Sequence, residues 1–270
     1  MVSLDVNGKS VLITGGSRGL GLHCAEVYVL NGARRVVITS RKEDQCMKAV
    51  QYLKDLSKTT NPGVEIGFIA ADLSTDEGAK KLKSEYQQRY GNQLNILVAN
   101  AGATWGASFE GHSRKAIDKV LGLNVAGVFQ TIQLFAAFLE KAGTPKDPSR
   151  VLIMSSVAGL TTSFPAGGTY GYLASKAAVS HLGKTLAVEL GPRNITVNVL
   201  APGFFPTKMS NGLLDVVGEQ MVKNNPRQRL GEKKDIQYLV LYLSSSLSNY
   251  VNGAVIPLDG GSHLVGLPKL

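Results

Sequence analysis

The chain has 270 residues, of which 44% are hydrophobic, and a formal net charge of +9. This length is ample for a large buried core, and α/β folds of this size commonly form one domain. The basic residues are scattered and form no dense stripe with interleaved aromatic side chains, so the charge indicates a solvated surface and not a nucleic-acid partner. We expect a single domain over residues 1–270, with a cofactor half at about 1–150 and a catalytic and substrate half at about 151–270.

Cysteine and histidine usage argues against a disulfide framework and a metal site. Cys24 and Cys46 are the only cysteines, and the four histidines have no ligand spacing, which favours a reducing compartment. We find no amino-terminal signal and no apolar stretch of about 20 residues, so we expect a cytoplasmic protein without a membrane segment. The ending Pro268-Lys269-Leu270 is one substitution from the S-K-L address, which leaves peroxisomal import as an alternative.

Apolar runs and helical periodicity alternate along the chain. We expect strands at residues 10–14, 35–39, 64–70 and 94–99, and helices at residues 20–31, 44–56, 75–89 and 113–141. A strand at 151–154, a helix at 172–190 closed by Gly191-Pro192, and strands at 196–200 and 254–257 follow. This alternation predicts an α/β fold with one doubly wound (Rossmann) parallel sheet and helices on both faces.

The glycine run from Thr14 to Gly21 (T-G-G-S-R-G-L-G) lies between the first strand and the first helix. Glycines at such a turn permit positive φ and let the backbone approach a pyrophosphate, and a helix amino terminus favours the anion. Where NAD sites carry an acidic residue after the second strand, this chain has Ser40 followed by Arg41. Arg18 adds a second cation, so we expect NADPH or NADP as the cofactor.

Tyr172 and Lys176 are four residues apart on an expected helix and therefore share a face. A nearby cation lowers the pKa of a phenol from its usual value near ~10, which makes the phenol a usable acid toward a carbonyl oxygen. Ser155 and Ser156 follow directly after the strand at 151–154, at the sheet edge where ligands bind in open α/β folds. The set points to nicotinamide-dependent redox chemistry.

In this order the motifs resemble those of the short-chain dehydrogenase/reductase family across essentially the whole chain. The family pattern T-G-x-x-x-G-x-G falls on 14–21, N-A-G on Asn100-Ala101-Gly102, the catalytic Asn on Asn124, Ser on Ser156, Y-x-x-x-K on Tyr172 and Lys176, and P-G-x-x-x-T on Pro202, Gly203 and Thr207. Within the family, residues 71–74, 100–106 and 201–206 resemble a rhamnolipid-associated β-ketoacyl reductase branch that includes secondary-metabolite ketoreductases. The loop between Ser156 and Tyr172 is longer than usual, and Ser155 is the alternative to Ser156 as the acting hydroxyl.

The resemblance implies an NADPH-dependent ketoreductase. It makes Tyr172 the proton donor, with Lys176 lowering its pKa and binding the nicotinamide ribose, Ser156 orienting the carbonyl and Asn124 supporting a water-linked proton path. Asp72 resembles the residue that contacts the adenine edge, with a turn or helix N-cap role as the alternative. The implied cofactor-binding residues are Gly15, Ser17, Arg18, Gly19, Leu20, Gly21, Ser40, Arg41, Asp72, Leu73, Asn100, Ala101, Gly102, Tyr172, Lys176, Pro202, Gly203 and Thr207.

The substrate is less well specified by the residues. Aromatic and methionine side chains near the motif ends favour a medium or large apolar carbonyl compound, such as a 3-oxoacyl chain, a polyketide or a terpenoid. The candidate pocket walls are Trp105, Phe109, Met154, Phe164, Tyr170, Phe204, Phe205 and Met209. Alternatives are an NADP-dependent alcohol dehydrogenase working in the oxidative direction and a non-catalytic NADP(H)-sensing binding protein, and the family resemblance implies a homo-oligomer, a tetramer or a dimer.

Overall fold

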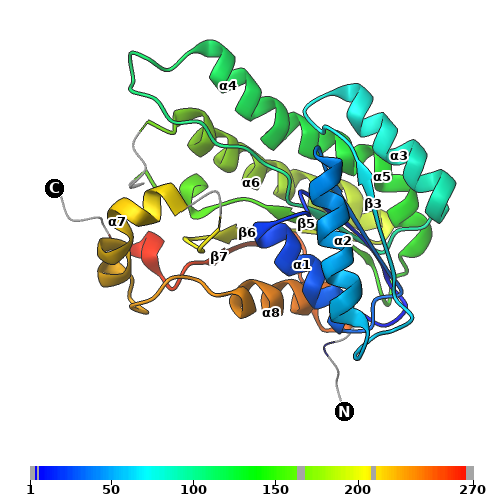
Figure 1. Ribbon diagram of the computed structural model, residues 1–270. Helices are drawn as coiled ribbons and strands as arrows, with labels where there is room; N and C mark the ends of the chain where they lie inside the picture. Colours follow the sequence, from blue (N-terminus) through cyan, green and yellow to red (C-terminus); the bar gives the residue numbers. More distant parts are fainter. Residues whose placement is uncertain (1–3, 5, 163–167, 208–210, 266–270) are drawn as a thin grey trace.

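The structure, a computed structural model, describes residues 4, 6–162, 168–207 and 211–265 of the chain. One parallel sheet in the order β3-β2-β1-β4-β5-β6-β7 lies between helices (Figure 1). Its strands are β1 (Ser10–Thr14), β2 (Arg35–Ser40), β3 (Glu65–Ala70), β4 (Ile96–Ala99), β5 (Ser149–Met154), β6 (Ile195–Pro202) and β7 (Val255–Leu258). The predicted doubly wound fold is confirmed.

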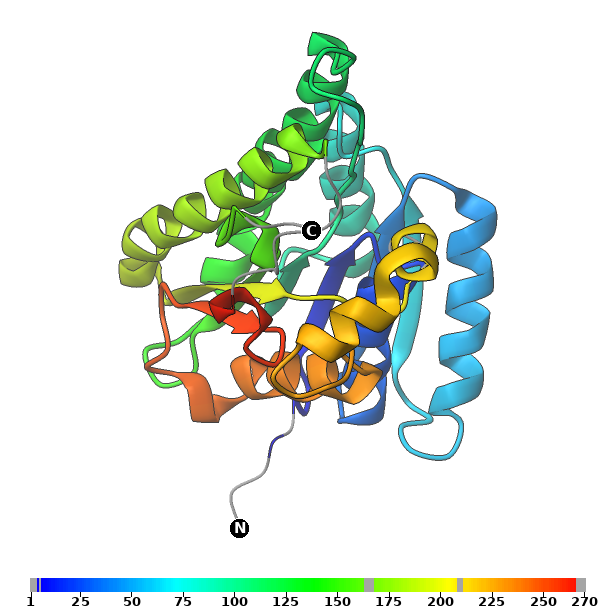
Figure 2. The ribbon, with the colours of Figure 1, turned by 90° about the vertical axis from the view of Figure 1, so that its left-hand side faces the viewer.

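The helices cover both faces of the sheet (Figure 2). Helices α1 (Gly19–Leu30), α2 (Glu43–Ser57) and α8 (Lys233–Ser244) pack on one face, and α3 (Asp76–Tyr90), α5 (Val128–Ala142) and α6 (Tyr170–Leu190) pack on the other. Alternate residues of a strand point to opposite faces, so Val11 and Ile13 of β1 join the first core while Leu12 joins the second. Cys24 of α1 is fully buried in the first core.

The order of the strands reverses beside β1. The chain runs outward through β1, β2 and β3 and then crosses back to place β4 on the other side of β1. At such a switch point the connections leave in opposite directions, which opens a crevice at the carboxyl ends of the strands. The glycine turn after β1 and the N-A-G motif after β4 therefore lie at the same edge of the sheet.

The helix expected at 113–141 is a continuous stretch with a wide turn in its middle. Helix α4 (Arg114–Leu121) passes through the π-helical turn η1 (Gly122–Gly127) into α5. A Cβ atom on Gly127 would lie 2.3 Å from the Leu73 carbonyl oxygen, so only glycine lets the turn pack against the chain after β3.

This stretch corrects the expectation about apolar length. Among the described residues, Arg114–Ala142 has an 18-residue window of mean hydropathy 1.5 and is long and apolar enough to cross a membrane by length and composition. Its inner face contributes Ile132, Phe135 and Leu139 to the core beside α3 and α6. Packing against protein therefore accounts for the apolar composition of this helix.

Two helices were missed by the sequence expectations. Helix α7 (Asn211–Asn224) and α8 lie between β6 and β7, where no element was expected. Helix α8 begins with a reciprocal cap between Glu232 and Asp235, which departs from the usual Ser/Thr-x-x-Glu form of this signal. It is held by burial of Ile236 and Val240 against the sheet.

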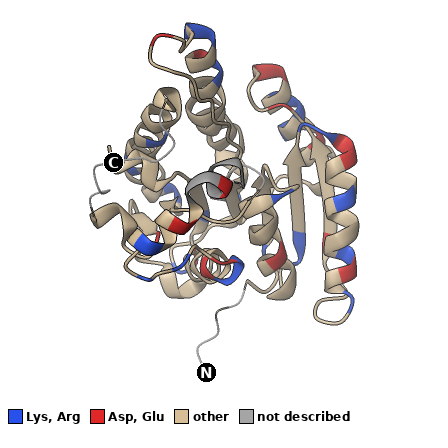
Figure 3. Ribbon diagram, turned by 60° about the vertical axis from the view of Figure 1, so that its left-hand side comes forward, with Lys and Arg blue, Asp and Glu red and all other residues tan. Residues whose placement is uncertain are grey.

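The charged residues are interspersed on the outer helices in the view of Figure 3. Several basic side chains pair with nearby carboxylates, including Arg114 with Asp118 at 2.9 Å and Arg193 with Glu140 at 2.7 Å. This distribution agrees with the expected solvated surface.

Candidate active site

A cleft of about 210 Å³ opens where β1, β2, β4 and β5 end. It brings together most of the predicted site residues, namely Gly15, Ser17, Arg18, Gly19, Leu20, Gly21, Ser40, Arg41, Asp72, Leu73, Asn100, Ala101, Gly102, Tyr172, Lys176 and Thr207. Asn124, Ser156, Pro202 and Gly203 are outside its walls. Sequence reasoning missed Thr39, Ala71 and Leu123, which also line the cleft and directly precede predicted site residues.

The glycine turn is built by close backbone contacts. Gly15 and Gly19 have positive φ, at 65° and 55°, and a Cβ atom on Gly21 would lie 2.4 Å from the Gly15 carbonyl oxygen. Helix α1 has no side-chain cap and no acidic residue in its first turn. Its first N–H groups and the positive end of its dipole are thus available to an anion in the cleft.

Asn100 fastens this turn to β4. Its side-chain amide donates to the Thr14 carbonyl at 2.9 Å and to the Gly15 carbonyl at 3.2 Å. The main-chain N–H groups of Asn100 and Ala101 both donate to the Thr14 hydroxyl at 2.9 Å. Thr14 and Asn100 thereby fix the glycine turn relative to the neighbouring strand end.

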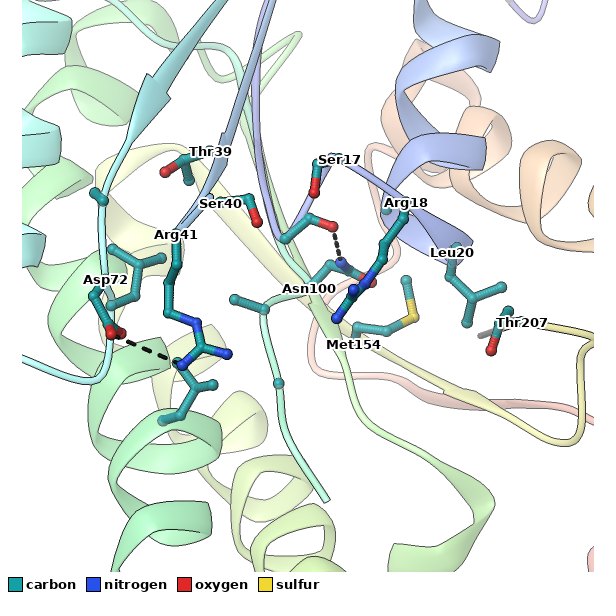
Figure 4. Close-up of a pocket in the computed structure, with 18 of the residues that line it drawn as sticks. Ser17, Arg18, Leu20, Thr39, Ser40, Arg41, Asp72, Asn100, Met154 and Thr207 are labelled. Atoms are coloured by element: carbon teal, nitrogen blue, oxygen red, sulfur yellow. Dashed lines mark hydrogen bonds and ion pairs between the residues drawn. The ribbon is translucent and has the colours of Figure 1, made fainter. Parts of the chain in front are cut away.

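Two cations line the cleft, Arg41 at the end of β2 and Arg18 at the start of α1 (Figure 4). Arg41 lies 3.9 Å from the Asp72 carboxylate, and both side chains are largely exposed. Arg18 extends into the cleft from the glycine turn. The Asp72 carboxylate also accepts from the main-chain N–H and the hydroxyl of Ser74, at 3.0 and 2.7 Å. These bonds to Ser74 are those of a turn aspartate, and the N-cap of α3 is Thr75. Contact of Asp72 with a cofactor stays a prediction.

Tyr172 and Lys176 meet the cleft one turn apart on α6. The Tyr172 phenol is hydrogen-bonded to Ser156, and the Lys176 ammonium lies 5.6 Å from the centre of the Tyr172 ring and donates to the Met154 carbonyl at 2.8 Å. Burial raises the pKa of Tyr172, opposed by the hydrogen bond from Ser156. Burial lowers the pKa of Lys176 from 10.5 to about 8.

These values correct the expectation that the lysine lowers the pKa of the phenol. Desolvation disfavours both charged forms and is the largest cause of the shift at each group. The phenol therefore keeps its proton, as a group that donates one requires.

The geometry distinguishes the two serines at the end of β5. Ser156 reaches the Tyr172 hydroxyl, whereas the Ser155 hydroxyl lies 2.9 Å from the Lys176 carbonyl and 2.7 Å from the Ser180 hydroxyl. Ser155 is thus turned toward the main chain of α6. The contacts favour Ser156 as the hydroxyl beside the reacting carbonyl.

Asn124 lies behind the cleft in the π-helical turn. Its side chain accepts from the Ala103 N–H at 2.8 Å and donates to the Ala103 carbonyl at 2.9 Å and to the Ser175 hydroxyl at 2.9 Å. A Cβ atom on Gly102 would lie 3.3 Å from the Asn124 amide oxygen and 3.6 Å from the Lys176 ammonium. The asparagine thus ties η1 both to Ala103, directly after the N-A-G motif, and to Ser175 of α6.

Pro202 and Gly203 lie between Ser156 and the end of β7. The Ser156 hydroxyl donates to the Pro202 carbonyl at 3.4 Å, and a Cβ atom on Gly203 would lie 2.6 Å from the Asp259 Cβ atom. The small residue lets the chain after β6 lie close to the end of β7.

The residues predicted to form the walls of the substrate pocket differ in exposure and in whether they line the cleft. Met154 lines the cleft, and Trp105, Phe109 and Tyr170 are 47%, 75% and 46% exposed. Phe109 stacks edge-on against Tyr170 with ring centres 5.8 Å apart. Phe204 is half-buried and outside the cleft walls, while Phe164 and Met209 lie outside the described residues.

Phe205 does not line the substrate pocket, contrary to the expectation from the sequence. It is 5% exposed and belongs to the core on the α1 and α8 face. A Cβ atom on Gly231 would lie 2.5 Å from its ring, so the ring packs tightly on the chain before α8. The side chain is core packing and not a substrate wall, because the chain after β6 turns it toward α8.

Comparisons with known proteins show the family of the chain. A family model described as enoyl-(acyl carrier protein) reductase matches residues 15–263. The rhamnolipids biosynthesis 3-oxoacyl-(acyl-carrier-protein) reductase of Pseudomonas aeruginosa is 35% identical over 259 residues, which are 95% of this chain and 97% of that protein. The 3alpha-hydroxysteroid dehydrogenase of Mediterraneibacter gnavus is 31% identical over 257 residues, 95% of this chain and 99% of that protein.

A solved structure has the same architecture. The Pseudomonas aeruginosa RhlG/NADP active-site complex superposes with a TM-score of 0.89 and 34% sequence identity, over 96% of this chain and 98% of that chain.

Proposed function

Since the chain belongs to the short-chain dehydrogenase/reductase family, we propose that it is an NADPH-dependent ketoreductase that converts a ketone of a medium or large apolar substrate into a secondary alcohol. The observation that carries this proposal is the hydrogen bond of Tyr172 with Ser156, one helical turn from the buried Lys176 and at the end of a cleft shaped for a dinucleotide.

The described residues fit NADPH. The glycine turn lines the cleft with Gly15, Gly19 and Gly21, which put no side chain in the way of a dinucleotide, and the uncapped start of α1 faces the cleft. Ser40 stands at the position where NAD sites carry an acid, and Arg18 and Arg41 supply guanidinium groups that can bind a 2′-phosphate. Named relatives also support this cofactor, because the RhlG structure is an NADP complex.

In the proposed reaction, NADPH when bound supplies the hydride. Tyr172 donates its phenolic proton to the carbonyl oxygen, and the Ser156 hydroxyl orients that oxygen. Lys176, held by the Met154 carbonyl at 2.8 Å, places an ammonium group beside the phenol and the cofactor ribose. Asn124 keeps the N-A-G segment and the helix in register and supports the route by which a proton returns toward Lys176.

For the substrate, we favour a 3-oxoacyl thioester. The Pseudomonas relative is named as a 3-oxoacyl-(acyl-carrier-protein) reductase. Met154 and the exposed rings of Trp105, Phe109 and Tyr170 offer apolar surface near α6. A steroid-like, polyketide or terpenoid ketone is the alternative, supported by the relative that acts on a hydroxysteroid. A homo-oligomer, a tetramer or a dimer, is part of the proposal and is testable by solution mass.

The test is NADPH consumption with a panel of 3-oxoacyl thioesters and polycyclic ketones, repeated with NADH. We expect turnover with NADPH and a loss of about 10²–10⁴ in the Tyr172→Phe variant, which lacks only the hydroxyl. Thermal unfolding and NADPH titration of that variant serve as controls and should match the wild type. Retention of more than about a tenth of wild-type turnover, with chemistry rate-limiting, would remove Tyr172 from the acid role.

Two other results would favour the alternatives. NADPH binding without turnover of any ketone in the panel would favour a cofactor-sensing protein. Turnover confined to alcohol oxidation by NADP would favour a dehydrogenase working in the oxidative direction.

A further inference from the structure

Two serines enclose the main-chain carbonyl of Lys176 in the protein interior. The Ser155 hydroxyl lies 2.9 Å from this carbonyl oxygen and the Ser180 hydroxyl lies 2.8 Å from it. The two hydroxyls are 2.7 Å apart, and Ser155, Ser180 and Lys176 are only 4%, 6% and 5% exposed. Each hydroxyl has one hydrogen to donate, so the two serines have two hydrogens for three close contacts, two with the carbonyl and one with each other. Each serine lies close enough to donate to the carbonyl without the other.

The side chain of the same lysine is held by the neighbour of Ser155. The Lys176 ammonium donates to the Met154 carbonyl at 2.8 Å, so consecutive residues at the end of β5 hold both ends of the lysine. The following turn, η2 (Val157–Gly159), lies against the main chain of Lys176. A Cβ atom on Gly159 would lie 2.5 Å from the Lys176 carbonyl carbon.

We propose that Ser155 and Ser180 are positioning residues for Lys176 and that they work as a redundant pair. The inference rests on the proposed function, in which Lys176 acts beside Tyr172. The segment from Ser155 to Gly159 also contains Ser156, so its position against α6 sets the distance between the Ser156 hydroxyl and the Tyr172 hydroxyl. The hydrogen bonds of the two serines to the Lys176 carbonyl fix that position.

Redundancy makes a specific pattern of variants diagnostic. Ser155→Ala and Ser180→Ala each leave one hydroxyl on the carbonyl, and kcat should stay within about threefold of the wild type. A net hydrogen bond is worth ~0.5–1.5 kcal/mol, which is up to about tenfold in rate. The double variant S155A/S180V removes both hydroxyls, and kcat should fall about tenfold or more.

A matched pair isolates the hydroxyl. S155A/S180T has nearly the same shape as S155A/S180V, but its threonine hydroxyl can bond the carbonyl four residues earlier in the helix. We expect S155A/S180T to recover kcat to within about threefold of Ser155→Ala. Equal kcat values for the threonine and valine variants would overturn the proposal. If S155A/S180V does not fold, S155A/S180A takes its place in the same comparison.

A remote serine controls for general loss of stability. Ser248 is 1% exposed and its hydroxyl donates to the carbonyls of Leu243 and Ser245, beyond the amino-terminal edge of the sheet. Ser248→Ala should lower the midpoint of thermal unfolding and leave kcat unchanged. A fall in kcat equal to that of S155A/S180V would overturn the positioning role. Absence of ketone-dependent NADPH consumption by the wild type would instead contradict the proposed function itself.

Discussion

Burial acts in opposite directions on the two titrating groups of the site. The phenol of Tyr172 has a raised pKa because its charged form is the anion, and Lys176 has a pKa lowered to about 8 because its charged form is the cation. The raised value keeps the proton of Tyr172 in place for donation. The lowered value means that the folded protein holds the Lys176 ammonium at a cost in stability.

This cost predicts that Lys176→Met is more stable than the wild type at neutral pH. A pKa lowered from 10.5 to about 8 corresponds to a destabilisation of about 3 kcal/mol, which the methionine variant avoids. The variant also loses the hydrogen bond to the Met154 carbonyl, which reduces the gain in stability by about 1 kcal/mol. We therefore expect a net gain of about 1–3 kcal/mol in the free energy of unfolding at pH 7, together with loss of turnover. Chemical denaturation measures the gain.

The stability difference between Lys176→Met and the wild type should depend on pH. Below the folded pKa of about 8, both folded and unfolded wild type carry the proton and the penalty is complete. Between about 8 and 10.5 the unfolded chain binds more protons, so wild-type stability rises and the gap to Lys176→Met closes. Lys184→Met, at an exposed position of the same helix, should stay within about 0.5 kcal/mol of the wild type at every pH. A gap that does not change with pH would contradict a buried ammonium.

At the residue scale, the sequence predicted the placement of those side chains whose position follows from neighbours in the chain. The Tyr172 and Lys176 pair and the glycine turn are of this kind, because helix and turn geometry place them. The direction of the Tyr172 pKa shift could not be predicted, since it depends on burial by residues far away in the sequence. The choice between Ser155 and Ser156 likewise required the position of α6.

At the element scale, the turn between β1 and α1 depends on the closeness of two backbones. A Cβ atom on Gly21 would lie 2.4 Å from the Gly15 carbonyl oxygen and 2.5 Å from the Asn100 amide nitrogen. The Asn100 amide cannot move away without breaking its hydrogen bonds to the Thr14 and Gly15 carbonyls, which hold the glycine turn.

We therefore predict that Gly21→Ala lowers stability by about 1–3 kcal/mol, the usual cost of overpacking, and weakens NADPH binding at least about tenfold. Gly63→Ala is the matched control, because a Cβ atom there would meet nothing within 4 Å. Thermal unfolding and NADPH fluorescence titration measure both effects. A Gly21→Ala protein that binds NADPH as tightly as the Gly63→Ala protein would contradict the tight-turn interpretation.

The end of β2 carries the prediction for cofactor choice. Arg41 is mostly exposed and pairs loosely with Asp72 at 3.9 Å, so it is available to a 2′-phosphate. A charged hydrogen bond contributes about 1.5–3 kcal/mol, and Arg41→Ala should therefore weaken NADPH binding about ten- to a hundredfold while leaving NADH nearly unchanged. Arg114→Ala, at a remote exposed pair, should alter neither affinity. Equal losses for the two cofactors would make Arg41 a structural residue.

Elements with strong local patterns were predictable within a few residues. The buried strands read as continuous apolar runs, which parallel sheets produce, and β1 was placed without error at 10–14. The π-helical turn and helices α7 and α8 were not predictable. Their reasons are tertiary, since Gly127 permits a close backbone contact with Leu73 and α8 is held by burial of one face.

At the scale of the whole molecule, the sheet gathers motifs that are more than a hundred residues apart in the chain. Parallel strands deliver their carboxyl ends to one edge, so the cofactor and catalytic motifs could be expected to meet there. The directions of aromatic side chains on the loops could not, because tertiary packing decides them. Phe205 turned into the core, while Trp105 remained 47% exposed with the Lys119 ammonium 5.7 Å from its ring.

The last prediction separates these two side chains. Phe205→Ala should lower the free energy of unfolding by about 3–5 kcal/mol, as for a large core residue, without changing the ratio of KM values for a bulky and a small ketone. Trp105→Ala should change stability by no more than about 0.5 kcal/mol and raise KM for the bulky ketone by a factor equivalent to about 1–3 kcal/mol. Denaturation and paired kinetics on both ketones test this. If Phe205→Ala instead kept its stability and shifted the substrate preference, its ring would have to face the substrate and not α8.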